Sequence, residues 1–182
     1  MKKWLAFLFA ALVLATVHEG MHALMAIPYG EYDAFRIKPI GFEVQYRTPV
    51  DGRGGIHWAL ISGAGNLVTI LMGYLLLLIG ESLARLRSSF LRAAFFYLTL
   101  ISLMTDPLNL SIGPFIYGGD ANGIAIGLAI NRYVIQSIFL VVFFVNRELV
   151  AHKLFAMYEV QVKHILFQPL IPRAKSNQRA TQ

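Results

Sequence analysis

The sequence predicts an all-α membrane protein that crosses the bilayer about four times, with a small β-hairpin between its first two spans. Hydrophobic residues make up 57% of the 182 residues and charged residues only 14%, whereas a soluble domain has roughly half and a quarter. The hydrophobic residues lie in long blocks, and one short stretch between the first two blocks alternates apolar and polar residues. Blocks of about 20 apolar residues are long enough to cross a bilayer as helices.

The apolar blocks define the predicted spans. The first covers residues 4–27, and Pro28 and Gly30 are expected to end its helix. The second, third and fourth predicted spans cover residues 58–80, 92–105 and 121–146. Asn131 and Arg132 interrupt the last block, so it is either one tilted helix or a short helix followed by a span.

Residues 35–47 predict a small membrane-associated β-hairpin. Apolar and polar side chains alternate on both sides of the segment Pro-Ile-Gly at residues 39–41. This period of two is typical of two short strands joined by a turn.

Residues 106–123, DPLNLSIGPFIYGGDANG, are expected to be largely non-helical. The segment is too apolar for an ordinary loop, yet its prolines and glycines disfavour a helix. Irregular backbone is tolerated at membrane depth only where it is buried in protein or lines a cavity. We therefore expect this segment to line a cavity.

The chain is predicted to consist of a membrane-embedded core, residues 1–147, and a C-terminal tail, residues 148–182. The first part of the tail mixes charged residues with scattered apolar ones, which favours an amphipathic helix on the membrane surface. The polar end of the tail is expected to be disordered.

The formal charge is +6. We interpret the basic residues as flanking charges that orient the spans in the membrane, so nucleic acid is not an expected partner. Four spans place both termini on one side, together with the arginines between the second and third spans. Basic loops favour the cytoplasmic side, so both termini are expected to be cytoplasmic. Anionic lipid headgroups are then the expected partners of these charges.

His18 and His22 lie within the first predicted span and form a candidate metal site. They are four positions apart, so on a helix both imidazoles point to one face. The chain has no cysteine, so a zinc ion would be held by His, Asp or Glu. Glu19 lies beside them, where its carboxylate can take a proton from a water molecule on the metal. Ionisable groups at this depth cost at least about 2.5 kcal/mol on insertion scales, which indicates a functional site; the alternative is a pair of hydrogen-bonded core histidines.

A catalytic zinc ion needs a third protein ligand and one open position. We expect Asp120 to be this ligand, although Asp is also a good helix N-cap. Asp106 is a second candidate, but its expected role is a helix cap or a turn ahead of Pro107. Weaker candidates outside the predicted spans are His57, His152 and His164.

Together these motifs resemble those of the site-2 protease family of intramembrane zinc metalloproteases. Residues 18–22, HEGMH, match the family's HExxH pattern on a transmembrane helix. Residues 62–66, SGAGN, are similar to its element of small residues followed by Asn. Residues 109–120 are similar to its broken segment that ends in a ligand Asp. The resemblance therefore covers three places across most of the chain.

The resemblance implies that His18, His22 and Asp120 bind one zinc ion per chain and that Glu19 is the general base. It further implies an endopeptidase that cuts peptide bonds in or beside the transmembrane segments of other proteins.

The resemblance also implies that Asn66 and Asn109 contact the substrate backbone, and that the hairpin of residues 35–47 pairs with an unwound substrate strand. This chain departs from the family pattern at Ala121, where glycine is common, and at Ala64, where the family has proline. Its segment before Asp120 is also longer than usual. No PDZ-like or CBS-like domain is recognisable, so it would be a compact member.

Two other functions remain open at this stage. The chain could bind zinc without proteolysis, or it could be a small metal or proton transporter that uses the intramembrane His and Asp. The transporter alternative has less support, because the chain has no obvious inverted repeat and few spans. The sequence contains no signal for the identity of the substrate or for the oligomeric state.

Overall fold

Long helices dominate the computed structural model, which describes residues 2–39, 41–117, 119–162 and 164–171. In this described part, four helices are long and apolar enough to cross a membrane. They are α1 (Lys2–Ala26), α2 (Ile56–Leu78), α4 (Ser89–Ser111) and α7 (Arg132–Leu149). The predicted fold class is thus confirmed in its helices and in the small hairpin described below.

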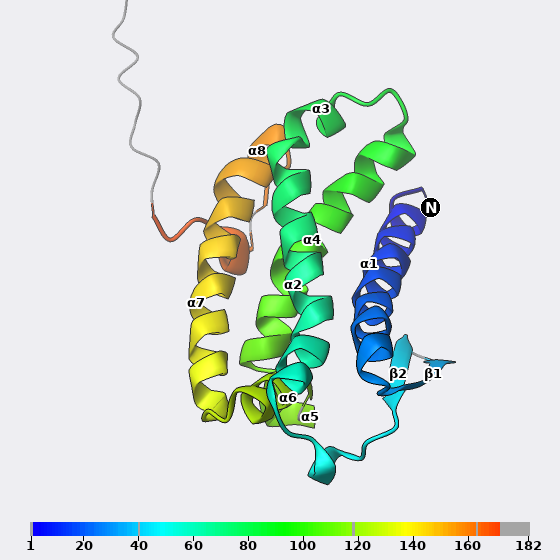
Figure 1. The fold of residues 1–182 in the computed structure, drawn as a ribbon. Helices are drawn as coiled ribbons and strands as arrows, with labels where there is room; N and C mark the ends of the chain where they lie inside the picture. Colours follow the sequence, from blue (N-terminus) through cyan, green and yellow to red (C-terminus); the bar gives the residue numbers. More distant parts are fainter. Residues whose placement is uncertain (1, 40, 118, 163, 172–182) are drawn as a thin grey trace, which may run out of the picture.

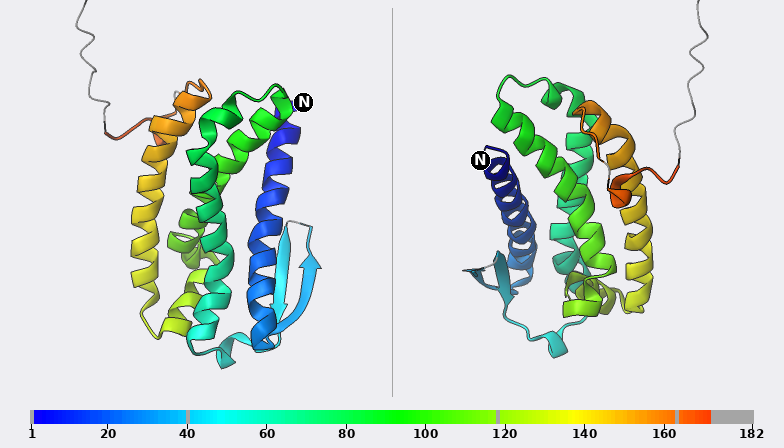
Figure 2. Two further views of the ribbon diagram at one scale, coloured as in Figure 1. Left: turned by 45° about the horizontal axis from the view of Figure 1, so that its top comes forward. Right: turned by 180° about the vertical axis from the view of Figure 1, so that it is seen from behind.

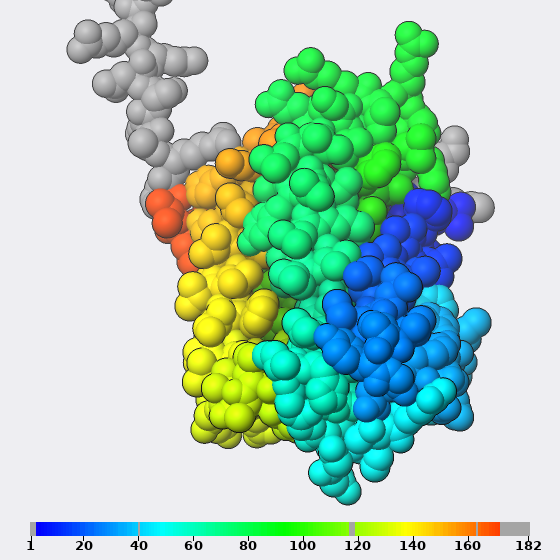
Figure 3. Space-filling view, in the orientation of Figure 1, coloured from blue at the N-terminus to red at the C-terminus, as the bar shows by residue number. Residues whose placement is uncertain are grey.

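The four long helices form one bundle in which α1 packs against α2 and α4, and α4 packs against α2 and α7 (Figure 1). The side chains of α2 fill the space between α1 and α7 in the space-filling view (Figure 3). The N-terminus lies at the same end of the bundle as α3 (Gly80–Ala84) and α8 (Phe155–Met157). The short helices α5 (Pro114–Tyr117) and α6 (Gly119–Leu128) lie at the opposite end (Figures 1 and 2).

The predicted hairpin is present beside the C-terminal half of α1 (Figure 2). Strand β1 (Tyr32–Ile37) pairs antiparallel with β2 (Phe42–Tyr46), and Phe35 lies opposite Val44. The chain reaches the hairpin through a 3-10 turn that contains Pro28 and ends at Gly30. Gly30 has a left-handed φ of 73° and donates its N–H to the carbonyl of Ile27, which closes the turn as the sequence predicts.

Helix α4 does not end at residue 105 as predicted but continues through Pro107 to Ser111. Proline cannot donate to the carbonyl four residues earlier, here that of Leu103. The side-chain amide of Asn146 on α7 replaces this donor, with Nδ2 2.7 Å from the oxygen of Leu103. Asn146 is fully buried and accepts a hydrogen bond of 2.5 Å from the hydroxyl of Tyr74. A neighbouring helix therefore satisfies the carbonyl that the proline leaves open.

The prediction of a largely non-helical segment at residues 106–123 is accordingly wrong. Apart from the turn at Ile112 and Gly113, its described residues belong to the end of α4, to α5 and to the start of α6. The open alternative for the last apolar block is also decided: it forms the short helix α6 followed by α7, which is long and apolar enough for a span. Asn131 caps α7 by accepting a hydrogen bond of 2.9 Å from the N–H of Tyr133.

The first part of the predicted tail continues the last span instead of forming a separate surface helix. A π-helical turn, Val150–Leu154, connects α7 to α8. Val150 and Leu154 are fully buried and pack with Leu77 of α2 and Leu103 of α4. The predicted disordered end of the chain lies outside the described residues.

The chain beyond α8 folds back onto α7 through the side chain of Arg147. This buried guanidinium donates to the carbonyls of Ile165, Leu166 and Gln168. Neighbouring Glu148 accepts from the N–H groups of Leu170 and Ile171.

Candidate metal centre

Helix α1 presents both histidines of the HEGMH segment to the interior of the bundle. The Nε2 atoms of His18 and His22 lie 3.1 Å apart. Only 2% of the surface of His22 is exposed. The spacing of four residues produces this arrangement, since such side chains lie above one another on a helix.

Asp120 of α6 completes a cluster of three potential ligands, as the sequence predicts. Its Oδ2 atom lies 3.4 Å from Nε2 of His18 and 3.6 Å from Nε2 of His22. The three ligand atoms are within 4.8 Å of one another. Among the described residues, this is the group of His and acidic side chains arranged to hold a metal ion.

Each histidine is held at the ring nitrogen that faces away from the cluster. Nδ1 of His22 lies 2.7 Å from the carbonyl oxygen of Ile61 on α2. Nδ1 of His18 lies 3.3 Å from Oδ1 of Asp106 on α4. Metal-binding histidines commonly have such a partner, which fixes the tautomer and leaves Nε2 free for the metal.

The predicted role of Asp106 as a helix cap or turn former is therefore wrong, because α4 continues past it. Asp106 is buried within the helix, with 5% of its surface exposed, and it also accepts a hydrogen bond from the hydroxyl of Thr69. It contacts His18, a potential ligand, and lies outside the cluster of three potential ligand atoms. The expectation that His57, His152 and His164 are weaker candidates agrees with their absence from the cluster.

Asn66 on α2 lies next to Asp120. Its Nδ2 atom donates to Oδ2 of Asp120 at 2.9 Å and to the carbonyl of Ser62 at 3.2 Å. Its buried Oδ1 atom has no hydrogen-bond partner within the described part of the chain. Asn66 thus contacts a potential metal ligand. Its contact with a substrate, which the family resemblance implies, stays a prediction.

Glu19 lies beside the cluster and contacts the β-hairpin. Its Oε2 atom accepts a hydrogen bond of 3.1 Å from the backbone N–H of Val44 in β2. The hairpin therefore helps to set the position of this half-buried carboxylate.

Two cavities reach the candidate centre from different directions. The first, of about 420 Å³, is a groove between α1 and α4. It is lined by His18, Glu19, Asp106 and Asn109 and by apolar side chains that include Phe7 and Phe42.

The second cavity, of about 380 Å³, is lined by Asp120 together with Tyr46, Arg53 and Ser62. The guanidinium of Arg53 lies 4.9 Å from the ring centre of Tyr46 and 4.5 Å from that of Trp58. Burial raises the pKa of Tyr46 above its usual range, and the nearby carboxylates add to this effect. Burial lowers the pKa of Arg53.

Small residues bring the helices of the centre together. A Cβ atom at Gly65 of α2 would lie 2.6 Å from the carbonyl oxygen of His18 and 2.6 Å from Nε2 of His22. On α6, a Cβ atom at Gly123 would lie 2.0 Å from Oγ of Ser62. These small residues therefore allow α1 and α6 each to pack closely against α2.

The donor set fits a zinc ion. Two imidazole nitrogens and one carboxylate oxygen are the ligands of many catalytic zinc sites, which keep a further position open. No protein-family model, curated protein or solved structure matches this chain. The resemblance to the site-2 protease family accordingly stays a prediction from the sequence motifs.

Proposed function

We propose that the protein is an intramembrane zinc endopeptidase. One observation carries the proposal: His18, His22 and Asp120 converge within a bundle of helices that are long and apolar enough to cross a membrane, and Glu19 lies beside them. Four ionisable groups in an apolar bundle are costly unless they serve a function. The partners of His18 and His22 at Nδ1 support metal binding, because they orient both rings towards Asp120.

The residues of the chain have distinct roles in this proposal. His18, His22 and Asp120 hold the metal, and a bound zinc ion supplies Lewis acidity that polarises a peptide carbonyl and activates water near neutral pH. Glu19 accepts the proton of the attacking water at its carboxylate and transfers it to the leaving amine. The N–H of Val44 keeps the Glu19 carboxylate in position.

The two cavities support separate routes to the centre for the substrate and for water. The groove between α1 and α4 has apolar walls and reaches both His18 and Glu19. These walls suit a peptide segment that comes from the bilayer. The second cavity contains Asp120 and Arg53 and supports a route for water to the same centre. In this proposal, the substrate is a transmembrane segment of another protein.

The test combines zinc content with cleavage in detergent-purified protein. Glu19→Gln should retain about one zinc per chain and lose cleavage of a single-span substrate. His22→Ala and Asp120→Ala should lose both zinc and cleavage. Glu43→Gln is a matched control, because Glu43 lies in the hairpin that contacts Glu19 but pairs with Lys38 and not with the cluster. Cleavage by Glu19→Gln at the wild-type rate would exclude the proposed role of Glu19.

The main alternative is a zinc-binding membrane protein without peptidase activity. It predicts one zinc per chain in wild-type protein and no cleavage across a panel of single-span substrates. Zinc that is bound in the wild type and lost in Asp120→Ala, without any cleavage, would support this alternative.

A further inference from the structure

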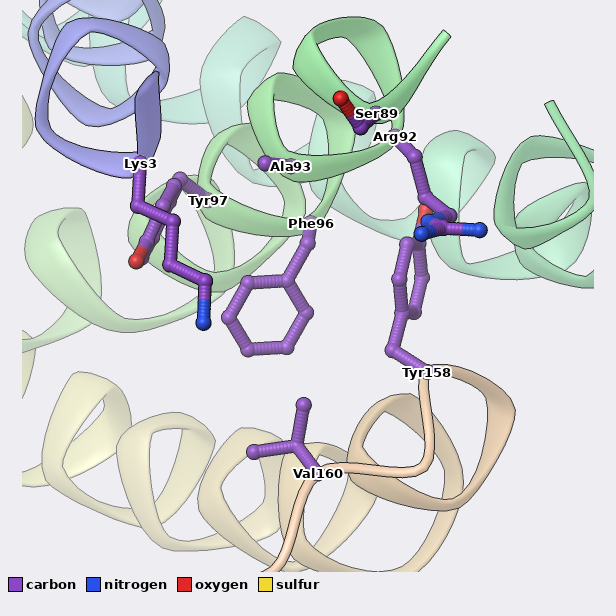
Figure 4. A pocket seen from close by; sticks show the side chains of 8 residues that line it. All are labelled: Lys3, Ser89, Arg92, Ala93, Phe96, Tyr97, Tyr158 and Val160. Carbon is purple, nitrogen blue, oxygen red and sulfur yellow. The ribbon is translucent and has the colours of Figure 1, made fainter. Parts of the chain in front are cut away.

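A third cavity lies at the end of the bundle opposite to the candidate metal centre. It has a volume of about 460 Å³ and is formed by the start of α1, the start of α4 and the residues that follow α8 (Figure 4). Its polar and apolar walls include Lys3, Ser89, Arg92, Phe96, Tyr158 and Val160.

Two cations from different helices border this cavity. Lys3 comes from α1 and Arg92 from the first turns of α4, and both side chains are exposed. Within the described residues, neither forms an ion pair with a carboxylate. Figure 4 shows the ammonium group of Lys3 extended towards the cavity, with Arg92 across the cavity near Tyr158. The described residues that line the cavity therefore carry positive charge and include no carboxylate.

The start of α4 adds further attraction for an anion. This helix has 23 residues, and the side chain of Ser88 caps it by accepting from the N–H of Leu91. The remaining N–H groups of a first helical turn and the helix dipole favour negative charge. Ser89 lies on the cavity wall at this position and adds a hydroxyl donor.

Part of the cavity wall is apolar and aromatic. The ring of Phe96 lies 5.3 Å from that of Tyr97 and 5.2 Å from that of Tyr158. Val160 faces Phe96 across the cavity (Figure 4). The buried hydroxyl of Tyr158 has no hydrogen-bond partner among the described residues, and it lies beside the guanidinium of Arg92 (Figure 4). A buried hydroxyl without a partner costs free energy that an oxygen of a ligand can recover.

We propose that this cavity binds an anionic phospholipid. Lys3, Arg92 and the first turn of α4 bind the phosphate, and the start of an acyl chain lies along Phe96 and Val160. The cavity combines two cations with an apolar wall, which favours an amphiphile over free phosphate. Free phosphate has no apolar part that could be buried against this wall. The position at the ends of two spans is also where lipid headgroups lie.

The test measures lipid binding to the detergent-purified full chain by native mass spectrometry. Phosphatidylglycerol and phosphatidylcholine with identical acyl chains are compared, and inorganic phosphate is a probe without chains. We expect clear preference for phosphatidylglycerol. Lys3→Gln and Arg92→Gln should each weaken its binding by about tenfold, as expected for one charge-assisted hydrogen bond of about 1.4 kcal/mol. Arg87→Gln is the matched control, because Arg87 is an exposed cation of the linker before α4 and does not line the cavity.

Several results would overturn the proposal. Equal binding of the two lipids would exclude recognition of the anionic headgroup. A loss in Arg87→Gln as large as that in Arg92→Gln would indicate general surface attraction. Competition by millimolar inorganic phosphate that removes the lipid completely would indicate a phosphate site without a lipid component. Zinc content is measured in the same samples and should stay at the wild-type value. A misfolded variant would lose its zinc and is recognised in this way. The zinc measurement also tests the metal centre separately from the lipid site.

Discussion

Oδ1 of Asp106 lies 3.3 Å from Nδ1 of His18, and Oδ2 of Asp120 lies 3.4 Å from Nε2 of the same imidazole. The two carboxylates therefore contact the two different nitrogens of one imidazole ring. A neutral imidazole has one N–H and one lone pair. Donation from Nδ1 to Asp106 leaves the lone pair of Nε2 for a metal ion. Asp106 is thus placed to orient His18, a potential metal ligand on another helix.

Removal of the Asp106 carboxylate should weaken zinc binding without unfolding the bundle. We expect Asp106→Ala to lower zinc affinity by about 10- to 100-fold, the usual effect of losing such a partner. Asp106→Asn should have a smaller effect, because its amide oxygen can still accept from Nδ1. Competition with a fluorescent chelator measures the affinities, and circular dichroism checks the helices. Wild-type affinity in Asp106→Ala would contradict the positioning role.

Gly65 controls the distance between α1 and α2 at the candidate centre. In Gly65→Ala the new methyl group would collide with the backbone of His18 and with the ring of His22. We expect the zinc content to fall well below one per chain, and overpacking to cost about 1–3 kcal/mol of stability. Gly63→Ala is a matched control, because its methyl group would meet only Ile124 at an ordinary 3.7 Å. Equal zinc contents in the two variants would contradict this account.

The parts of the centre that depend on local sequence could be predicted, and those that depend on distant partners could not. The spacing of His18 and His22 fixes their common face, and alternation predicts the hairpin. The sequence predicts a cap or turn at Asp106 because the following Pro107 is a strong helix-ending signal. The donor that lets α4 continue past it comes from Asn146, which is 43 residues after Leu103 in the sequence. No local pattern identifies such a partner, although a buried carboxylate in an apolar block is itself a signal of function.

The end of α7 also depends on partners that are distant in the sequence. In the sequence, the charged residues near position 148 predict a segment at the membrane surface. In the structure, the carbonyls of residues 165, 166 and 168 satisfy the guanidinium of Arg147. A buried charge is tolerated when hydrogen bonds compensate it, and these partners become visible only in the folded chain.

The link between Asn146 and Pro107 can be tested with a double-mutant cycle. Asn146→Leu removes the donor to the carbonyl of Leu103 and leaves the hydroxyl of Tyr74 without its acceptor. We expect a loss of about 2–4 kcal/mol in unfolding free energy, since two buried polar groups lose their partner. In a Pro107→Ala background the backbone N–H of residue 107 can serve the Leu103 carbonyl. Asn146→Leu should then cost about 1–2 kcal/mol less. Additive effects, measured by denaturant titration in detergent, would show that the two residues are not coupled.

The hydrogen bond between Val44 and Glu19 gives a test of the hairpin's role in activity. The N–H of Val44 points to Glu19, so proline at this position removes the donor to the carboxylate. We expect Val44→Pro to keep its zinc and to lose about tenfold in the rate of substrate cleavage, which corresponds to about 1.4 kcal/mol of positioning. Val44→Ala is the control, because it removes most of the same side chain but keeps the N–H. If both variants cleave a single-span substrate equally well, the hairpin does not position Glu19. If Val44→Pro is faster than the control, the hydrogen bond restrains the base in the free protein and the substrate must displace it.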